Sequence, residues 1–222
     1  MQRFAELEQA TAAFLSASLV GGGWEDALEG IARSAGASSA VLIRERHLRV
    51  SASMTTPSYA EPMARHMKGL GPPNSRHVRV RTTLAGGFRA DQDDYGLDEL
   101  KRDVFYQEFM RPLGLFWHAN AKLGGTETDF VEISLKFGIG SGPCRHELLH
   151  ALDRQLANLR AAARVSQRLL EAEASGMVHV LELRGHPIFE INALGAILRA
   201  HGAPIEQLEL PLRSNTRRLV AA

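Results

Sequence analysis

The stretch from Arg145 to Glu173 contains neither glycine nor proline, and this constrains the fold more than any other feature of the chain. It predicts one continuous helix of about 40 Å, at a rise of 1.5 Å per residue. Residues spaced alternately by three and four form one stripe along this helix: Leu149, Leu152, Leu156, Leu159, Ala163, Ser166 and Leu170. The spacing is that of the a and d positions of a coiled coil.

Two interpretations of the stripe remain open. In the first, the helix packs on the sheet of its own domain. In the second, which we favour, the helix starts on its own domain and continues into a partner chain, because one small sheet cannot cover a stripe about 30 Å long without protein at both ends. A symmetric dimer is the commonest assembly for such a surface. The predicted homodimer interface consists of Leu149, Leu152, Leu156, Leu159, Ala163 and Leu170.

The rest of the chain combines helical and strand patterns, which predicts an α+β fold with an antiparallel sheet. Helices are expected at residues 2–19, 24–35, 61–68, 97–111 and 192–201. Strands are expected at residues 39–43, 47–54, 78–83, 116–123, 130–137, 178–183, 188–191 and 208–212. Gly176 is expected to end the long helix. These elements predict a first domain at residues 1–144, the helix at 145–174 and a small second unit at 175–222.

Composition excludes several classes of protein. The net charge is +1, from 26 basic and 25 acidic residues, whereas a module that binds nucleic acid by itself is usually much more basic. The N-terminus lacks the pattern of a signal peptide, and no apolar run approaches about 18 residues. We therefore expect a cytoplasmic protein that does not bind a membrane. Cys144 is the only cysteine, so an internal disulfide is excluded.

Residues 146–150 read H-E-L-L-H and match the H-E-x-x-H motif of zinc peptidases, in which two histidines bind zinc and the glutamate is the general base. The longer form of the motif is excluded, because Asp153 and Leu156 stand in place of its glycine and its third histidine. Glu171 has the approximate separation of the third ligand in the other form, but on a continuous helix it lies about 30 Å from His150. A zinc hydrolase with His146 and His150 as metal ligands is therefore a minor alternative, and we expect no metal and no cofactor.

Aromatic residues gather in the middle third of the chain, where a helix and a strand that both carry aromatics can enclose an apolar pocket with polar groups at its edge. An ordinary core is the equally weighted alternative. The candidate ligand-facing residues are Phe88, Tyr106, Trp117 and His118. Cys144 precedes the long helix, where a thiol pKa can be lowered, but a structural role is the simpler interpretation.

Residues 103–115, D-V-F-Y-Q-E-F-M-R-P-L-G-L, resemble a segment of the form S-x-F-Y-x-x-F-x-R-P-x-G-L in a large group of bacterial regulators. Weaker similarities occur at residues 24–32, at the G-S-G-P of residues 140–143 and at residues 178–193, so the resemblance extends along nearly the whole chain. These regulators join a GAF/PAS-like sensory region to a LuxR-type helix-turn-helix. Cys144 stands where the group usually has an aromatic residue.

The resemblance implies a GAF/PAS-like sensor domain, a signalling helix and a partial PAS-like unit, with the DNA-binding helices outside these 222 residues. It implies a transcription regulator rather than an enzyme. A small-molecule effector would bind between the sheet and the helix at 97–111 and would change how the long helices pair. DNA would be contacted only through a domain not in this chain. A dimerisation module without a ligand is the other alternative to the sensor.

Overall fold

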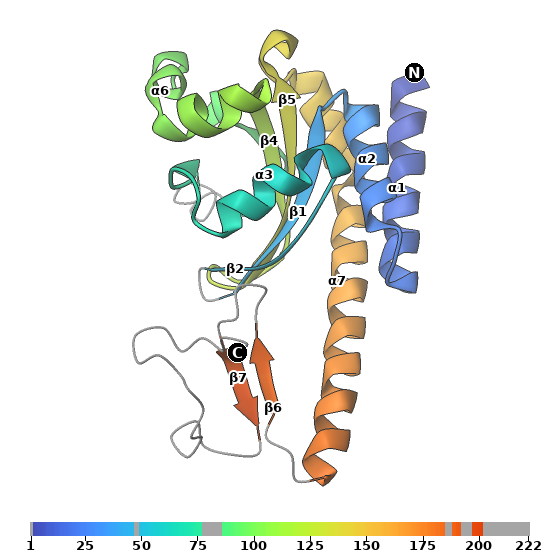
Figure 1. Cartoon of the computed structure of the whole chain (residues 1–222). Coiled ribbons are helices and arrows are strands. Elements are labelled where there is room, and N and C mark those ends of the chain that lie inside the picture. The colour runs from blue at the N-terminus through green and yellow to red at the C-terminus, as the bar shows by residue number, and fades with distance from the viewer. Residues whose placement is uncertain (1, 47–48, 77–85, 185–187, 192–196, 202–222) are drawn as a thin grey trace. The chain divides into compact units, whose positions relative to one another are not determined.

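The computed structural model describes residues 2–46, 49–76, 86–184, 188–191 and 197–201 (Figure 1). The chain divides into two compact units, residues 1–166 and 167–222, which are described separately. The division falls within α7 (His146–Leu183), which is a single unbroken helix. In the described part of the chain, no helix is long and apolar enough to cross a membrane.

The first unit is an α+β fold around a five-stranded antiparallel sheet with the strand order β2-β1-β5-β4-β3. The strands are β1 (Ser39–Arg46), β2 (Arg49–Thr55), β3 (Arg89–Ala90), β4 (Leu115–Gly125) and β5 (Phe130–Gly138). The expected strands 39–43 and 47–54 are confirmed as the antiparallel pair β1–β2, and the expected strands 116–123 and 130–137 as the antiparallel pair β4–β5. The expected strand 78–83 lies outside the described residues.

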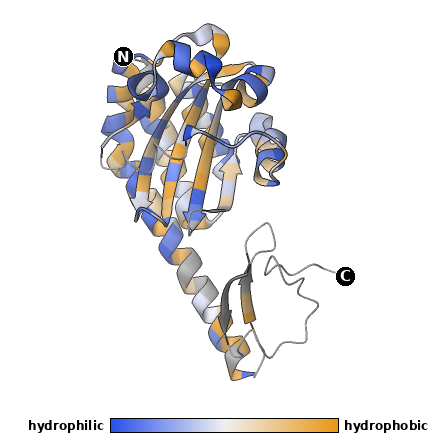
Figure 2. Cartoon of the chain, turned by 90° about the vertical axis from the view of Figure 1, so that its left-hand side faces the viewer, coloured by the Kyte–Doolittle hydropathy of each residue, from blue (hydrophilic) through white to orange (hydrophobic). Residues whose placement is uncertain are grey.

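Helices cover both faces of this sheet (Figure 1). The helices α1 (Gln2–Val20), α2 (Trp24–Ala35) and the first part of α7 lie on one side. The helices α3 (Pro57–Met67) and α6 (Leu97–Arg102) lie on the other side. The two faces of the sheet are therefore covered by different sets of helices. Along the strands, hydrophobic and hydrophilic residues alternate (Figure 2).

The face toward α1, α2 and α7 is a hydrophobic core. Because residues opposite one another in an antiparallel pair point to the same face, Ala40, Leu135 and Ala119 form one row across the sheet. The helices contribute fully buried side chains to this core, namely Phe14, Leu28, Ile31, Leu152 and Leu159. Burial of each large apolar side chain stabilises the fold by about 1.5–3 kcal/mol.

Five residues of the predicted dimer stripe belong to this same core. The side chains of Leu149, Leu152, Leu156, Leu159 and Ala163 are all buried within a single chain. Their burial corrects the predicted interface at these five positions, because this part of the stripe packs on its own domain. The side chain of Leu170 lies outside the described residues, and the homodimer itself stays a prediction.

The segment expected to be one helix at residues 97–111 is broken. The helix α6 ends at Arg102, a π-helical turn η1 spans Tyr106–Met110, and a 3-10 turn η2 spans Arg111–Leu113. Asp103 has extended backbone, and its Oδ1 accepts a hydrogen bond from the backbone N–H of Tyr106 (3.2 Å). A side chain that caps the following turn favours such a break. Before α6, residues Asp91–Asp94 form a short helix, α5.

The R-P-x-G-L part of the regulator-like segment has a clear structural role. Proline stands at the start of η2, where its fixed φ suits a tight turn. Gly114 ends the turn with φ +72°, a left-handed conformation that favours glycine. The next residue, Leu115, begins β4 and is buried. The motif thus reverses the chain from η2 into the sheet.

The second unit differs from the prediction. Gly176 does not end α7, and residues 178–183 are helical rather than a strand. The strand expected at 188–191 is confirmed as β6 (Ile188–Ile191), which pairs antiparallel with β7 (Ile197–His201). Residues 197–201 are therefore a strand rather than the end of the predicted helix. The expected strand 208–212 lies outside the described residues.

Candidate ligand-binding site

The face of the sheet toward α3 carries polar and charged side chains, although it is covered. The register places His118 beside Lys136 and Lys122 beside Glu132. His118 and Lys136 are each 3% exposed, Ser134 is 2% exposed and Glu132 is 6% exposed. Charged side chains are rarely buried to this extent unless they are paired or serve a site.

Three of these groups, Lys136, Ser134 and His118, form a hydrogen-bonded chain that continues to Asp91 and Tyr106. Lys136 Nζ donates to Ser134 Oγ (3.0 Å), and Ser134 Oγ is 2.5 Å from Nε2 of His118. His118 Nδ1 is 3.1 Å from Oδ1 of Asp91, and the hydroxyl of Tyr106 donates to Oδ2 of Asp91. Because the ionised carboxylate of Asp91 can only accept, the neutral imidazole of His118 carries its proton on Nδ1, and its Nε2 accepts a hydrogen bond from the Ser134 hydroxyl. Every contact then runs from donor to acceptor and ends on the Asp91 carboxylate.

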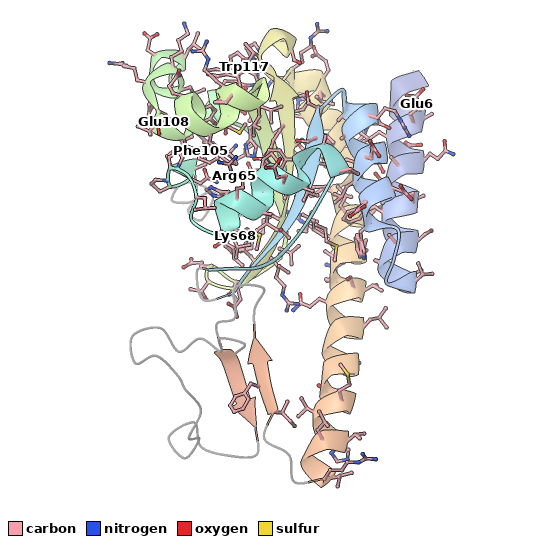
Figure 3. All side chains as sticks on the ribbon, in the orientation of Figure 1. Glu6, Arg65, Lys68, Phe105, Glu108 and Trp117 are labelled. Atoms are coloured by element: carbon pink, nitrogen blue, oxygen red, sulfur yellow. The ribbon has the colours of Figure 1, made fainter. Side chains whose placement is uncertain are left out.

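Arg76 lies beside the end of this chain. It is 5% exposed, and its Nη1 is 3.8 Å from Oδ2 of Asp91. Its Nε donates to Oδ1 of Asn74 (3.2 Å), and its guanidinium lies 5.0 Å from the ring centre of Phe105. Phe105 also contacts His66 of α3 edge-on, on the same side of the sheet (Figure 3). The aromatic contact and the Asn74 hydrogen bond fix the orientation of a buried cation.

The protonation states follow from burial and from these neighbours. Burial disfavours ionisation of Asp91, but His118, Arg76 and Tyr106 outweigh it and hold the pKa of Asp91 below its usual value. Burial, together with the charge of Arg76, lowers the pKa of His118 to about 3, so its imidazole is neutral. Burial and Arg76 also lower the pKa of Lys136 to about 7. Lys136 is therefore the group in this cluster that titrates near neutral pH.

A cavity opens beside the cluster. Its empty space is about 470 Å³, including the open mouth, but the room left between side chains fits only about two water-sized groups. The lining combines apolar residues with the charged cluster and draws on β1, β2, α3, β4, β5 and the segments between them. The lining residues are Ile43, Val50, Tyr59, Met63, His66, Asn74, Arg76, Phe105, His118, Glu132, Ser134 and Lys136.

The structure brings together two of the four predicted ligand-facing residues. Tyr106 and His118 both bind Asp91, and His118 also lines the cavity. Trp117 pairs with Phe137 in the sheet register and so lies on the opposite face from His118. Phe88 is buried, and its backbone N–H donates to Oδ1 of Asp153 on α7 (2.5 Å). Neither Trp117 nor Phe88 lines this cavity, and a ligand-facing role for these two residues stays a prediction.

The sequence interpretation missed most of the charged site, namely Arg76, Asp91, Glu132, Ser134 and Lys136. The signal was the alternation E-x-S-x-K within β5, flanked by apolar residues. Such alternation is also the normal pattern of a strand with one solvated face. Only the position of α3 and of the segment carrying Arg76 distinguishes a covered polar face from an exposed one.

The segment that carries Asp91 is hydrogen-bonded to α7 and to Cys144, which lies two residues before α7 begins. On one side Phe88 N–H binds Asp153, as above, and on the other side Nε2 of Gln92 donates to the backbone carbonyl of Cys144 (2.7 Å). Arg160 of α7 adds bonds to the carbonyl oxygens of Gly86 (3.0 Å) and Lys122 (3.2 Å). Hydrogen bonds of its neighbours Phe88 and Gln92 therefore connect the segment that carries Asp91 to the start of α7.

The alternative sites gain no support from the described residues. His146 and His150 are exposed at the start of α7, and α7 continues unbroken through Glu171. Within the described ranges, no three histidine, cysteine or acidic side chains are grouped as metal ligands. Cys144 is buried, and burial raises the pKa of its thiol to about 12, which suits the structural role.

In comparisons with known proteins, no protein-family model matches the chain and no curated protein is significantly similar to it. The site is therefore interpreted from its own geometry.

Proposed function

We propose that the first unit is a small-molecule sensor and that the chain is the effector-sensing region of a bacterial transcription regulator of the LuxR-type group. The observation that carries the sensing function is the buried charged cavity whose Asp91 segment is bonded to α7. The regulator-like segment at 103–115 supports the proposal, because its Phe105 and Tyr106 pack against Arg76 and bind Asp91. DNA binding would belong to a helix-turn-helix outside these residues.

The energetics favour a binding site over a purely structural cluster. A lysine whose pKa falls from 10.5 to about 7 on folding costs about 5 kcal/mol at a pH below 7. An apolar side chain of similar length would avoid this cost, since well-packed apolar replacements of buried charges are often neutral or stabilising. Retention of such a group beside a cavity is typical of functional sites, which trade stability for ligand recognition.

The proposed mechanism is a population shift rather than catalysis. A ligand that contacts Arg76, His118 or Lys136 changes the hydrogen bonds that reach Asp91. The Asp91 segment then favours one of two positions of α7, by an amount set by the difference in ligand affinity between them. In the proposed homodimer, α7 would transmit this difference to the partner chain and to the DNA-binding helices.

The experiment is a thermal-shift screen of the chain against small acids, amines and neutral polar compounds, followed by hydrogen exchange of α7. We expect at least one compound class to raise Tm and to change exchange at residues 86–92 and in the first part of α7. Val50→Phe, which puts a larger side chain into the lining of the cavity, is expected to remove the response, and Val104→Phe, at an exposed position, is expected to keep it. A chain that no compound stabilises, or whose response survives Val50→Phe, contradicts the sensor proposal.

The regulator part has separate tests. Light scattering after size exclusion measures whether the chain is a dimer, and the reading frame after Ala222 shows whether a helix-turn-helix is encoded there. A monomer, or a reading frame that encodes no DNA-binding helices, would contradict the regulator proposal and would leave the sensor proposal unaffected.

A further inference from the structure

The cavity contains cationic donors that the protein itself leaves unused. Nη1 of Arg76 is buried and has no hydrogen-bond partner among the described residues, because Asp91 at 3.8 Å is beyond hydrogen-bond distance. A buried donor without a partner costs roughly 1–3 kcal/mol, so it points to a group that arrives from outside the chain. The guanidinium is held in place by Phe105 and Asn74, which fixes the direction of this donor.

Lys136 provides the second set of donors. Its ammonium has three N–H groups and makes one hydrogen bond, to Ser134. The ring of Tyr59 lies 4.7 Å from Nζ and covers one side of the ammonium. Both Lys136 and Arg76 line the cavity, so their free donors face the same small space.

We infer that the ligand of this cavity is a small monocarboxylate, with its carboxylate group bound by Arg76 and Lys136. The inference rests on the proposed sensor function and names the chemical class of its effector. A carboxylate presents two acceptor oxygens that match a guanidinium and an ammonium. The room between the side chains holds about two water-sized groups, so the ligand is restricted to a carboxyl group with a short apolar end, part of which would lie in the open mouth of the cavity.

Other charges in the cavity set the pH dependence of binding. The titratable groups that face Lys136 are Glu132 on its own strand, His118 on β4, Asp91 on α5, Tyr59 and His66 on α3, and Arg76. Asp91 is already bonded to Tyr106 and His118, and His118 is neutral. Glu132 repels an incoming anion, and full protonation of Lys136 offsets that repulsion. Because Lys136 is half protonated near pH 7, ligand binding takes up part of a proton at this pH.

The test uses acetate and propionate as probes, with chloride, acetamide and methylammonium as matched controls at equal ionic strength. Calorimetry on the unmodified chain at pH 6 and pH 8 is expected to show carboxylate binding that is about tenfold weaker at pH 8, from the fall in protonated Lys136. Titration at pH 7 in two buffers of different ionisation enthalpy measures the proton uptake directly and needs no variant.

Variants then locate the site. We expect Arg76→Met and Lys136→Met to weaken acetate binding at least tenfold. Arg65→Met on α3 (Figure 3) and Lys101→Met on α6, both at exposed positions, should leave it unchanged. Equal binding of acetamide, absence of proton uptake, or full binding by both cavity variants overturns the carboxylate inference. If amines or neutral compounds bind instead, the sensor proposal stands and only the inference of a carboxylate ligand fails. If no compound class binds, both fail.

Discussion

Replacement of Lys136 by methionine gives the sharpest test of the buried cluster. The folded protein holds Lys136 with a pKa of about 7, against an ordinary value of 10.5, because the ammonium is buried and lies near Arg76. Between these two values the unfolded chain binds a proton that the folded chain does not. Stability must therefore rise with pH in this window, by at most about 1.4 kcal/mol per unit.

The magnitude follows from the same pair of pKa values. From pH 6 to pH 9, Lys136 alone raises the free energy of unfolding by about 2–3 kcal/mol, with the rise beginning near pH 7. Lys136→Met removes this rise. The substitution also changes packing and removes the bond to Ser134, but those effects are independent of pH and cancel when slopes are compared.

Urea denaturation at half-unit steps from pH 6 to pH 9 provides the measurement, with the unmodified chain, Lys136→Met and Lys101→Met compared. We expect the first and third curves to rise together and the Lys136→Met curve to lie flatter. Parallel curves for all three proteins would refute the reasoning, because they would show that Lys136 remains ionised in the fold at an ordinary pKa.

Three further predictions concern the groups that connect Lys136 to α7. His118 is neutral in the fold, with a pKa of about 3, so acidification from pH 7 to pH 5 protonates its imidazole only in the unfolded chain. This lowers the free energy of unfolding by about 2 kcal/mol. His118→Gln should remove that loss, measured by urea denaturation between pH 5 and pH 7. Tyr106→Phe deletes a buried hydrogen bond to Asp91 and should lower the free energy of unfolding by about 1–3 kcal/mol, whereas an unchanged midpoint would mean that the bond is replaced by water. Gly87→Ala places a Cβ within 2.2 Å of the Asp153 carboxylate, so we expect faster amide exchange at Phe88 and a lower Tm, and the nearby Gly86→Ala, which meets no atom within 4 Å, serves as its control.

The sheet and its helices could be predicted because local patterns determine them. The β4–β5 hairpin follows from strand alternation around two glycines, and α2 follows from helical spacing closed by Gly36 with φ +73°. Gly176 misled the prediction because a single glycine costs a helix only about 1 kcal/mol, which the rest of α7 outweighs. The break at Asp103 depends on one side-chain cap and leaves no periodic signal.

The stripe along α7 shows the limit of periodicity. A spacing of three and four residues indicates that one face of a helix is buried, but it does not indicate against what. Here α1, α2 and the sheet bury the residues of the stripe from Leu149 to Ala163 within one chain. The same ambiguity hid the site, since the alternation in β5 fits an exposed face as well as a covered one. Arg76 and Asp91 reach the site from segments between the long strands, and no local pattern connects them to Lys136.

In the proposed sensor, a ligand in this cavity would change the position of α7 only through the hydrogen bonds of the segment that carries Asp91. Lys136, Ser134 and His118 form a series of donors that ends on the Asp91 carboxylate. On either side of Asp91, the backbone N–H of Phe88 is bonded to Asp153 of α7 and the side-chain amide of Gln92 to the carbonyl of Cys144. A ligand shifts α7 only through free energy that differs between two positions of this segment. A bound carboxylate that accepts the Lys136 hydrogen bond in place of Ser134 would leave the serine oxygen without that donor. The hydrogen bond from Ser134 to His118 would then change, and with it the hydrogen bond from His118 to Asp91. A ligand that fills the cavity without changing the hydrogen bonds among Lys136, Ser134, His118 and Asp91 would bind and still leave α7 unchanged. Affinity and signalling would therefore depend on different atoms of the same site.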